Sequence, residues 1–211
     1  MDRNELVRRG SHAERREATR ARVFAAATDV IYHHGYAALT TTRAAEEAGV
    51  SRGALQQQFP TKEALVVGLI EHLADVIDAP RTARLLDIPA GVERWLALPD
   101  VVWGDSQSPA AITFLEIQLA TRSHPSLAER IQPVAMALKR RRHDLIFAIA
   151  QEAGIDDRAA VEEIVEHDTA ALNGFVIELM FTGDRHSVLR GFERMKRLCS
   201  ASAASLIAQD R

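Results

Sequence analysis

The stretch AGVSRGALQQQF, residues 48–59, combines a cation suited to reading bases with a row of amides. Arg52 can donate two hydrogen bonds to the edge of a guanine, and a glutamine such as Gln56 or Gln57 can donate to and accept from an adenine. Gly53 is small where a helix must approach a nucleic acid closely. These residue types indicate a helix that faces DNA, although the stretch alone is also compatible with a surface helix whose glutamines face water.

Two short helices joined by a tight turn are expected to position these side chains. Three threonines at 40–42 offer capping hydroxyls for a first helix, and Gly49 supplies the turn that ends it. Ser51 caps the second helix, expected over 52–58, which ends at Phe59 because the residue before a proline is pushed out of helical geometry. This arrangement is a helix-turn-helix, whose second helix lies in the major groove of DNA.

The rest of the chain places apolar residues at helical spacing and shows no sustained alternation typical of strands. We therefore expect an all-α fold. Between helices at 61–78 and 109–122 we expect a looser connection, which Pro80, Pro89 and Pro99 interrupt. The other helices are expected over residues 13–34, 125–153, 157–181 and 185–208, with a kink or break at Pro133.

The composition restricts the class of protein. A hydrophobic fraction of 47% can form a buried core, and a net charge of −3 argues against a general polyanion binder. Only residues 1–62 have an excess of basic over acidic residues. A single cysteine, Cys199, favours a reducing cytoplasm, and no apolar run is long enough for a membrane span.

The segment HGYAALTTTRAAEEAGVSRGALQQQFPTKEALV resembles the N-terminal domain of the TetR (tetracycline-repressor-like) family of transcriptional regulators. The matching pieces are the turn at Gly35-Tyr36, the helix-opening Thr40, the AGVS turn, and the F-P-x-K-E-x-L pattern from Phe59 to Leu65. Each piece is common, but their order is specific. The resemblance covers about residues 15–75, whereas the remainder is similar to the family in length and helical pattern only.

The resemblance implies three parts: a flexible basic arm at 1–12, a three-helix DNA-binding domain at 13–61 with a linker helix at about 61–78, and a helical bundle at 79–211 that binds an effector and dimerises. The positions that usually contact phosphates in the family hold Thr40, Thr42, Ser51 and Lys62, and the base-reading face holds Arg52, Gly53 and Gln57. The family often has a Tyr-His pair where this chain has Gln56 and Gln57, so the usual aromatic phosphate contact is absent.

Candidate effector contacts are the aromatic and misplaced polar residues of the C-terminal part: Trp103, Phe114, Gln118, Phe147, Asp168 and Phe175. Buried polar groups such as Gln118 and Asp168 need partners, which a ligand or a second subunit could supply. Ordinary core packing is the alternative for each aromatic residue. The sequence contains no metal-binding motif, phosphate loop or nucleophile elbow, so we expect no metal, no cofactor and no enzymatic activity.

Two apolar stripes predict a homodimer through about residues 157–208 and, by symmetry, a near-palindromic DNA operator. The stripes consist of Val161, Ile164, Val165, Leu172, Phe175, Val176 and Leu179, with Phe192, Met195, Leu198 and Leu206.

Together these patterns predict a cytoplasmic, ligand-responsive DNA-binding regulator, more in keeping with a repressor than an activator, whose effector is small and mostly apolar. One alternative is a helical protein-interaction module with a helix-turn-helix that has lost DNA binding, and another is a helical enzyme. The sequence names neither the effector nor the operator.

Overall fold

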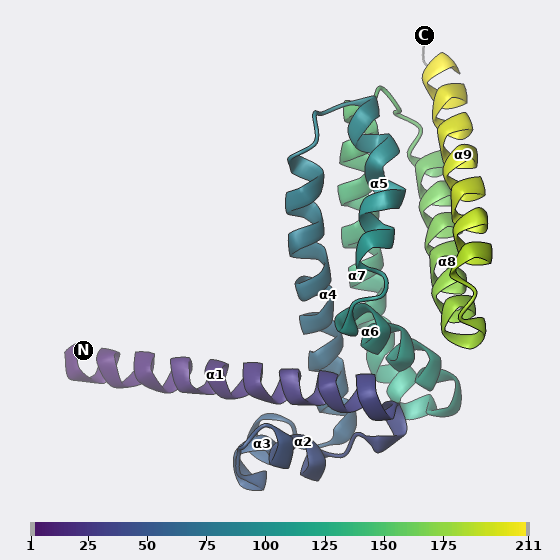
Figure 1. Cartoon of the computed structure of the whole chain (residues 1–211). Coiled ribbons are helices and arrows are strands. Elements are labelled where there is room, and N and C mark those ends of the chain that lie inside the picture. Colours follow the sequence, from purple (N-terminus) through teal and green to yellow (C-terminus); the bar gives the residue numbers. More distant parts are fainter. Residues whose placement is uncertain (1–2, 210–211) are drawn as a thin grey trace. The chain divides into compact units, whose positions relative to one another are not determined.

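The computed structural model describes the backbone of residues 3–209 and the side chains of residues 13–208. Within these bounds the chain is entirely helical, with no strand, which confirms the expected all-α class (Figure 1). The α-helices are α1 (Arg3–His34), α2 (Thr41–Glu47), α3 (Arg52–Gln58), α4 (Lys62–Leu86), α5 (Val92–Asp105), α6 (Pro109–Ala120), α7 (Pro125–Glu152), α8 (Arg158–Thr182) and α9 (Arg185–Gln209).

The helices form two compact units. The first consists of Met1–Ala74 with Ile112–Val134, and the second consists of Asp75–Ala111 with Ala135–Arg211. Helices α4 and α7 each begin in the first unit and end in the second. Residues 112–134 therefore fold with the predicted DNA-binding part, and the functional division at 61 and 79 stays a prediction.

Aromatic packing closes the core of the first unit. The rings of Phe24 on α1 and Phe59, which follows α3, lie 5.4 Å apart between centroids, and both side chains are buried. A Cβ at Gly68 on α4 would come within 3.1 Å of the Phe24 ring and 3.3 Å of the Phe59 ring. The glycine at this position thus allows α4 to approach both rings closely.

The core of the second unit lies among α5, α7, α8 and α9, where Trp95, Ile149, Ile155 and Val161 belong to one buried cluster. Next to this cluster lies Arg94, a residue that is only 7% exposed. It donates to the carbonyl of Ile88 and, at 2.6 Å, to the carboxylate of Glu152. This buried cation is therefore paired and hydrogen-bonded, as a buried charge must be.

The expected looser connection between the fourth and fifth predicted helices is wrong, because α4 continues past Pro80 and α5 contains Pro99. Trp95 and Trp103 lie about two turns apart on α5 and are both buried. Burial of a tryptophan contributes about 4–6 kcal/mol at about 25 cal/mol per Å², which exceeds the cost of about 3 kcal/mol for a proline inside a helix.

Two other helix bounds differ from the expectation. α7 is continuous through Pro133, which is exposed, so the helix does not break there. α1 begins at Arg3 rather than near residue 13, because residues 3–12 contain no strong helix stop. Of the predicted flexible arm at 1–12, residues 1 and 2 lie outside the described residues, and the backbone from Arg3 on belongs to α1.

Candidate DNA-binding site

The helix-turn-helix begins with a capped α2 and ends it with a left-handed glycine. Thr40 is the N-cap of α2, and its hydroxyl oxygen accepts a hydrogen bond of 3.0 Å from the backbone N–H of Arg43. At the other end Gly49 has φ of 61°, and its N–H donates to Glu46 while the N–H of Val50 donates to Ala45. These two bonds form a Schellman motif, which ends the helix and turns the chain toward α3.

The second helix is fixed by a cap and a buried anchor. The Ser51 hydroxyl accepts a hydrogen bond of 3.1 Å from the N–H of Ala54, and Leu55 is fully buried. Because the N-cap sets where the helix begins and Leu55 sets which side faces the core, the outward side is also determined. The bounds of both short helices, 41–47 and 52–58, agree with the prediction.

The outward side of α3 carries the predicted base-reading residues. Arg52, Gly53, Gln56 and Gln57 are all exposed, and at about 100° per residue they fall within one arc of the helix. Ser51 at the start of α3 is also exposed. An exposed face of one cation and two amides can present donors and acceptors to the edges of base pairs.

Arg52 is held in place by α2. Its guanidinium donates to Glu46 at 3.0 Å, and the two side chains are 69% and 63% exposed. An exposed ion pair of this kind contributes about 0–1 kcal/mol. Arg52 can therefore leave Glu46 for a guanine edge or a phosphate at a small cost in free energy.

Lys62 points to the protein and not freely outward. Its ammonium group donates to the carbonyl oxygen of Tyr36 at 3.1 Å and lies 4.0 Å from the centre of the Tyr36 ring. Burial lowers the pKa of this lysine below its ordinary value. An ammonium group has three donors, so the predicted phosphate contact stays a prediction that requires Lys62 to share its donors with Tyr36.

Two residues at this site were missed in the sequence. Glu116 on α6 accepts a hydrogen bond of 3.0 Å from the backbone N–H of Tyr36, which lies 80 positions earlier in the chain. Arg43 on α2 is half-exposed, and its guanidinium has no ion pair among the described residues. A cation beside the phosphate-contact candidates Thr40 and Thr42 could have suggested Arg43, whereas no local pattern could have indicated Glu116.

The effector candidates of the second unit do not converge on one place. Trp103 stacks on Phe192 with 5.1 Å between ring centroids and meets Phe175 edge-on at 6.4 Å. Phe147 instead lies under the guanidinium of Arg158. Trp103 and Phe175 are thus brought together by core packing, which was the alternative for each aromatic.

The polar candidates also have separate surroundings. Asp168 accepts hydrogen bonds from the Cys199 thiol at 2.8 Å and shares one of 2.9 Å with the His167 ring, so its carboxylate is satisfied within the chain. Phe114 and Gln118 belong to α6 in the first unit, and Gln118 is exposed. Their contact with an effector stays a prediction.

The predicted interface stripe on α8 is largely covered by the chain itself. Val161, Leu172 and Val176 are buried, and α9 lies beside α8 (Figure 1). The large apolar side chains that remain exposed on the described part of these two helices are Ile177, Met180, Phe181 and Leu198. An apolar stripe in the sequence of one helix indicates that this face is buried. It does not indicate whether the same chain or a second subunit covers the face.

No described helix is both long and apolar enough to span a membrane. A capped helix-turn-helix with one cation and two amides exposed on its second helix, within an all-α chain, is the arrangement typical of helix-turn-helix DNA-binding regulators.

Comparison with known proteins specifies the class. Residues 23–69 match the family described as bacterial regulatory proteins, tetR family. The HTH-type transcriptional regulator CymR of Pseudomonas putida is 27% identical over 190 residues, which cover 90% of this chain and 91% of CymR. A TetR-family regulator from Streptomyces coelicolor has a similar structure, with a TM-score of 0.69 at 20% identity over 90% of each chain. The multidrug binding protein EbrR, solved with imidazole, gives a TM-score of 0.61 at 23% identity over 85% of this chain and 88% of EbrR.

Residues 23–69 thus carry the N-terminal domain of the TetR family, and the comparisons support a DNA-binding transcriptional regulator of this family. The comparisons point to regulation of transcription and not to an enzyme.

Proposed function

We propose that the protein is a cytoplasmic repressor that binds a near-palindromic operator as a homodimer and leaves it when a small effector binds. The observation that carries the DNA-binding part is the exposed face of α3. Arg52, Gly53, Gln56 and Gln57 share this face, and the buried Leu55 fixes it outward.

The proposed roles follow from the chemistry of each side chain. Arg52 reads a guanine after leaving Glu46, and Gln57 reads an adenine. Thr40, Thr42 and Ser51 donate to phosphates, and their place at helix N-termini adds the favourable dipole of the backbone N–H groups. Gln56 takes the position of the family's aromatic phosphate contact and offers its amide in place of a phenol.

Three cations supply the electrostatic part of the binding. Lys62 and Arg43 contact phosphates, and Arg52 adds its charge at the groove. Because each phosphate contact releases counterions, affinity should fall steeply with salt.

The test is a gel shift with DNA from upstream of the protein's own gene, followed by fluorescence anisotropy over a series of salt concentrations. Arg52→Ala should weaken binding by about 1–3 kcal/mol and relax the sequence preference. Arg122→Ala is a matched control, because Arg122 is an exposed arginine of the same unit outside the helix-turn-helix. If Arg52→Ala left affinity and sequence preference unchanged, the proposal that α3 lies in the major groove would be wrong. If no upstream fragment shifted, the result would favour the alternative of a protein-interaction module.

The effector part of the proposal rests on one structural relative and on the aromatic residues of the second unit. EbrR is described as a multidrug binding protein, and its solved structure holds imidazole. Here an effector would bind in the second unit near Trp103 and Phe175. Since α4 is one continuous helix from Lys62 to Leu86, it links that unit to the start of the DNA-binding part.

The dimer part rests on the apolar face that α8 and α9 leave uncovered. Phe181 is 87% exposed, and the exposed Ile177 lies three positions before Met180 and four before Phe181, so the three side chains share one side of α8. A contiguous exposed apolar patch is typical of an interface. Light scattering should give a dimer for the native chain and a monomer for Phe181→Glu; a monomer for the native chain at micromolar concentration would contradict the proposal.

A further inference from the structure

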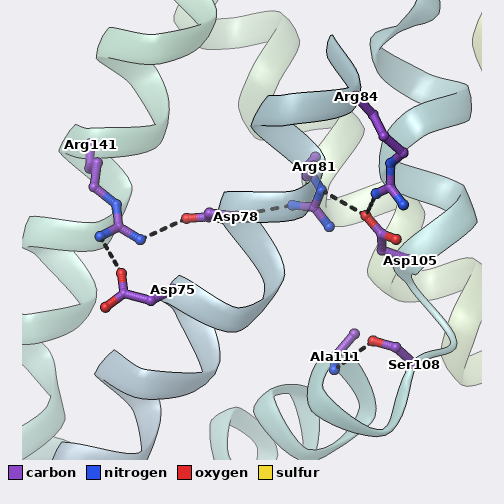
Figure 2. A network of polar contacts seen from close by, with 8 residues as sticks. All are labelled: Asp75, Asp78, Arg81, Arg84, Asp105, Ser108, Ala111 and Arg141. Atoms are coloured by element: carbon purple, nitrogen blue, oxygen red, sulfur yellow. Dashed lines mark hydrogen bonds and ion pairs between the residues drawn. The ribbon is translucent and has the colours of Figure 1, made fainter. Parts of the chain in front are cut away.

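A cluster of charged side chains in the second unit contains one more cation than anion. Arg141 on α7 donates to Asp75 and Asp78 on α4, at 2.8 Å each, while Arg81 and Arg84 of α4 both approach Asp105 on α5 (Figure 2). These three arginines thus share three carboxylates.

The fourth guanidinium of the cluster has no partner. Arg142 follows Arg141 on α7 and makes no hydrogen bond or ion pair with any described residue, and its Nε is buried. Asp78 lies within its electrostatic reach but already pairs with Arg141, and Glu166 within the same reach is held by Lys139 at 2.5 Å. The cluster therefore retains one uncompensated positive charge on Arg142, and the nearby charge of Arg81 repels it and lowers its pKa.

Two more buried side-chain nitrogens, one on Arg81 and one on His143, lack a hydrogen bond among the described residues. Arg81, whose side chain is 19% exposed, has a buried Nε without a hydrogen bond, at 3.6 Å from Asp105. His143, next to Arg142 in the chain, is 6% exposed, and its Nε2 has no partner. Burial lowers the pKa of Arg81 and of Arg142 below the ordinary value of an arginine, because a buried site disfavours the charged form. Buried polar atoms without a hydrogen bond are costly, and the Nε atoms of Arg81 and Arg142 in one cluster require an explanation.

We propose that Arg142, together with Arg81, holds the carboxylate of a small organic acid with an apolar body. One negative charge completes the balance of the cluster, whereas a phosphate dianion would overcompensate it. A guanidinium fork matches the two oxygens of a carboxylate in one plane. An apolar body agrees with the buried Leu85, which lies one turn after Arg81 on the same side of α4. The assignment rests on the proposed function in one respect only: it makes this acid the effector.

The first experiment measures the midpoint of thermal unfolding of the native chain at fixed ionic strength, with hexanoate and with hexanamide. A ligand that binds the folded state raises the midpoint. The expected result is a saturable rise with hexanoate and none with hexanamide, which has the same body without the charge. An equal rise with both probes, no rise with hexanoate, or an equal rise with inorganic phosphate would overturn the assignment.

The second experiment locates the site. Arg142→Gln should weaken hexanoate binding at least tenfold, whereas Arg140→Gln should leave it unchanged, because Arg140 is an exposed arginine of α7 without a partner among the described residues. Equal binding by both variants would overturn the role of Arg142. Should Arg142→Gln not fold, the comparison of the two probes on the native chain still decides.

Operator binding, measured without any acid, separates this inference from the proposed function. If the protein binds hexanoate through Arg142 but shifts no DNA, the result supports the anion site and contradicts the repressor proposal. If the protein shifts DNA but does not bind hexanoate, the result supports DNA binding and contradicts the anion site.

Discussion

Substitution of Gly53 by alanine should have opposite effects on stability and on DNA binding. We expect Gly53→Ala to raise the free energy of unfolding and to weaken the affinity for DNA. The residue lies within α3, and an added Cβ would meet nothing within 4 Å. Alanine in place of a helical glycine reduces the entropy of the unfolded chain, which is worth about 0.5–1 kcal/mol. Near the first turn of α3 we expect the lower value, a gain of about 0.5 kcal/mol in the free energy of unfolding.

The same methyl group should weaken DNA binding. Gly53 lies on the exposed face with Arg52 and Gln57, and in the proposed complex this face contacts the groove. A methyl group forced into a packed contact costs about 1–3 kcal/mol, which corresponds to roughly tenfold or more in Kd. Urea denaturation gives the stability, and fluorescence anisotropy with labelled operator gives the Kd.

Gly49→Ala is the matched control with the opposite sign on stability. A Cβ at Gly49 would also meet nothing within 4 Å, but its φ of 61° is left-handed. Backbone strain alone should therefore destabilise Gly49→Ala by about 1–2 kcal/mol. If Gly53→Ala were stabilised and bound operator as tightly as the native chain, the glycine would not face DNA. If it were destabilised, the helical assignment of Gly53 would be wrong.

The remaining predictions concern single groups of the two units. Arg94→Ala should lower the free energy of unfolding by about 3–5 kcal/mol, because it leaves the carboxylate of Glu152 and the carbonyl of Ile88 without their donor; a loss below about 1 kcal/mol in urea denaturation would refute this. Glu116→Ala should cost about 1–3 kcal/mol, since it leaves the N–H of Tyr36 without its acceptor, whereas Glu116→Gln retains an acceptor and should cost less. Burial and the carboxylate of Asp168 raise the pKa of Cys199 to about 12, so the folded thiol should react slowly with a thiol reagent at pH 8 and rapidly in urea. Because this pKa is raised, the contribution of Cys199 to stability is complete below its unfolded pKa and is lost as the pH rises toward about 12; fast labelling of the folded chain would contradict the burial of the thiol.

The sequence alone determined the local structure of the helix-turn-helix. The bounds of α2 and α3 followed from Thr40, Gly49 and Ser51, because caps and turns depend on hydrogen bonds between residues three to five positions apart. The all-α class followed in the same way from the helical spacing of apolar residues. The family followed from ordered short motifs around the same turn.

The tertiary structure decided everything that depends on contacts between distant segments. Lys62 is drawn to the carbonyl and ring of Tyr36, and Glu116 reaches the same residue from α6. The segment around Pro80 and Pro99 is helical because buried side chains outweigh the cost of a proline, and propensity gives no measure of that burial. For the same reason the sequence pattern identified apolar stripes and arginines but not their partners. Only the packing of α4, α5 and α7 decides which charges are compensated, because compensation depends on distance in space and not on separation along the chain.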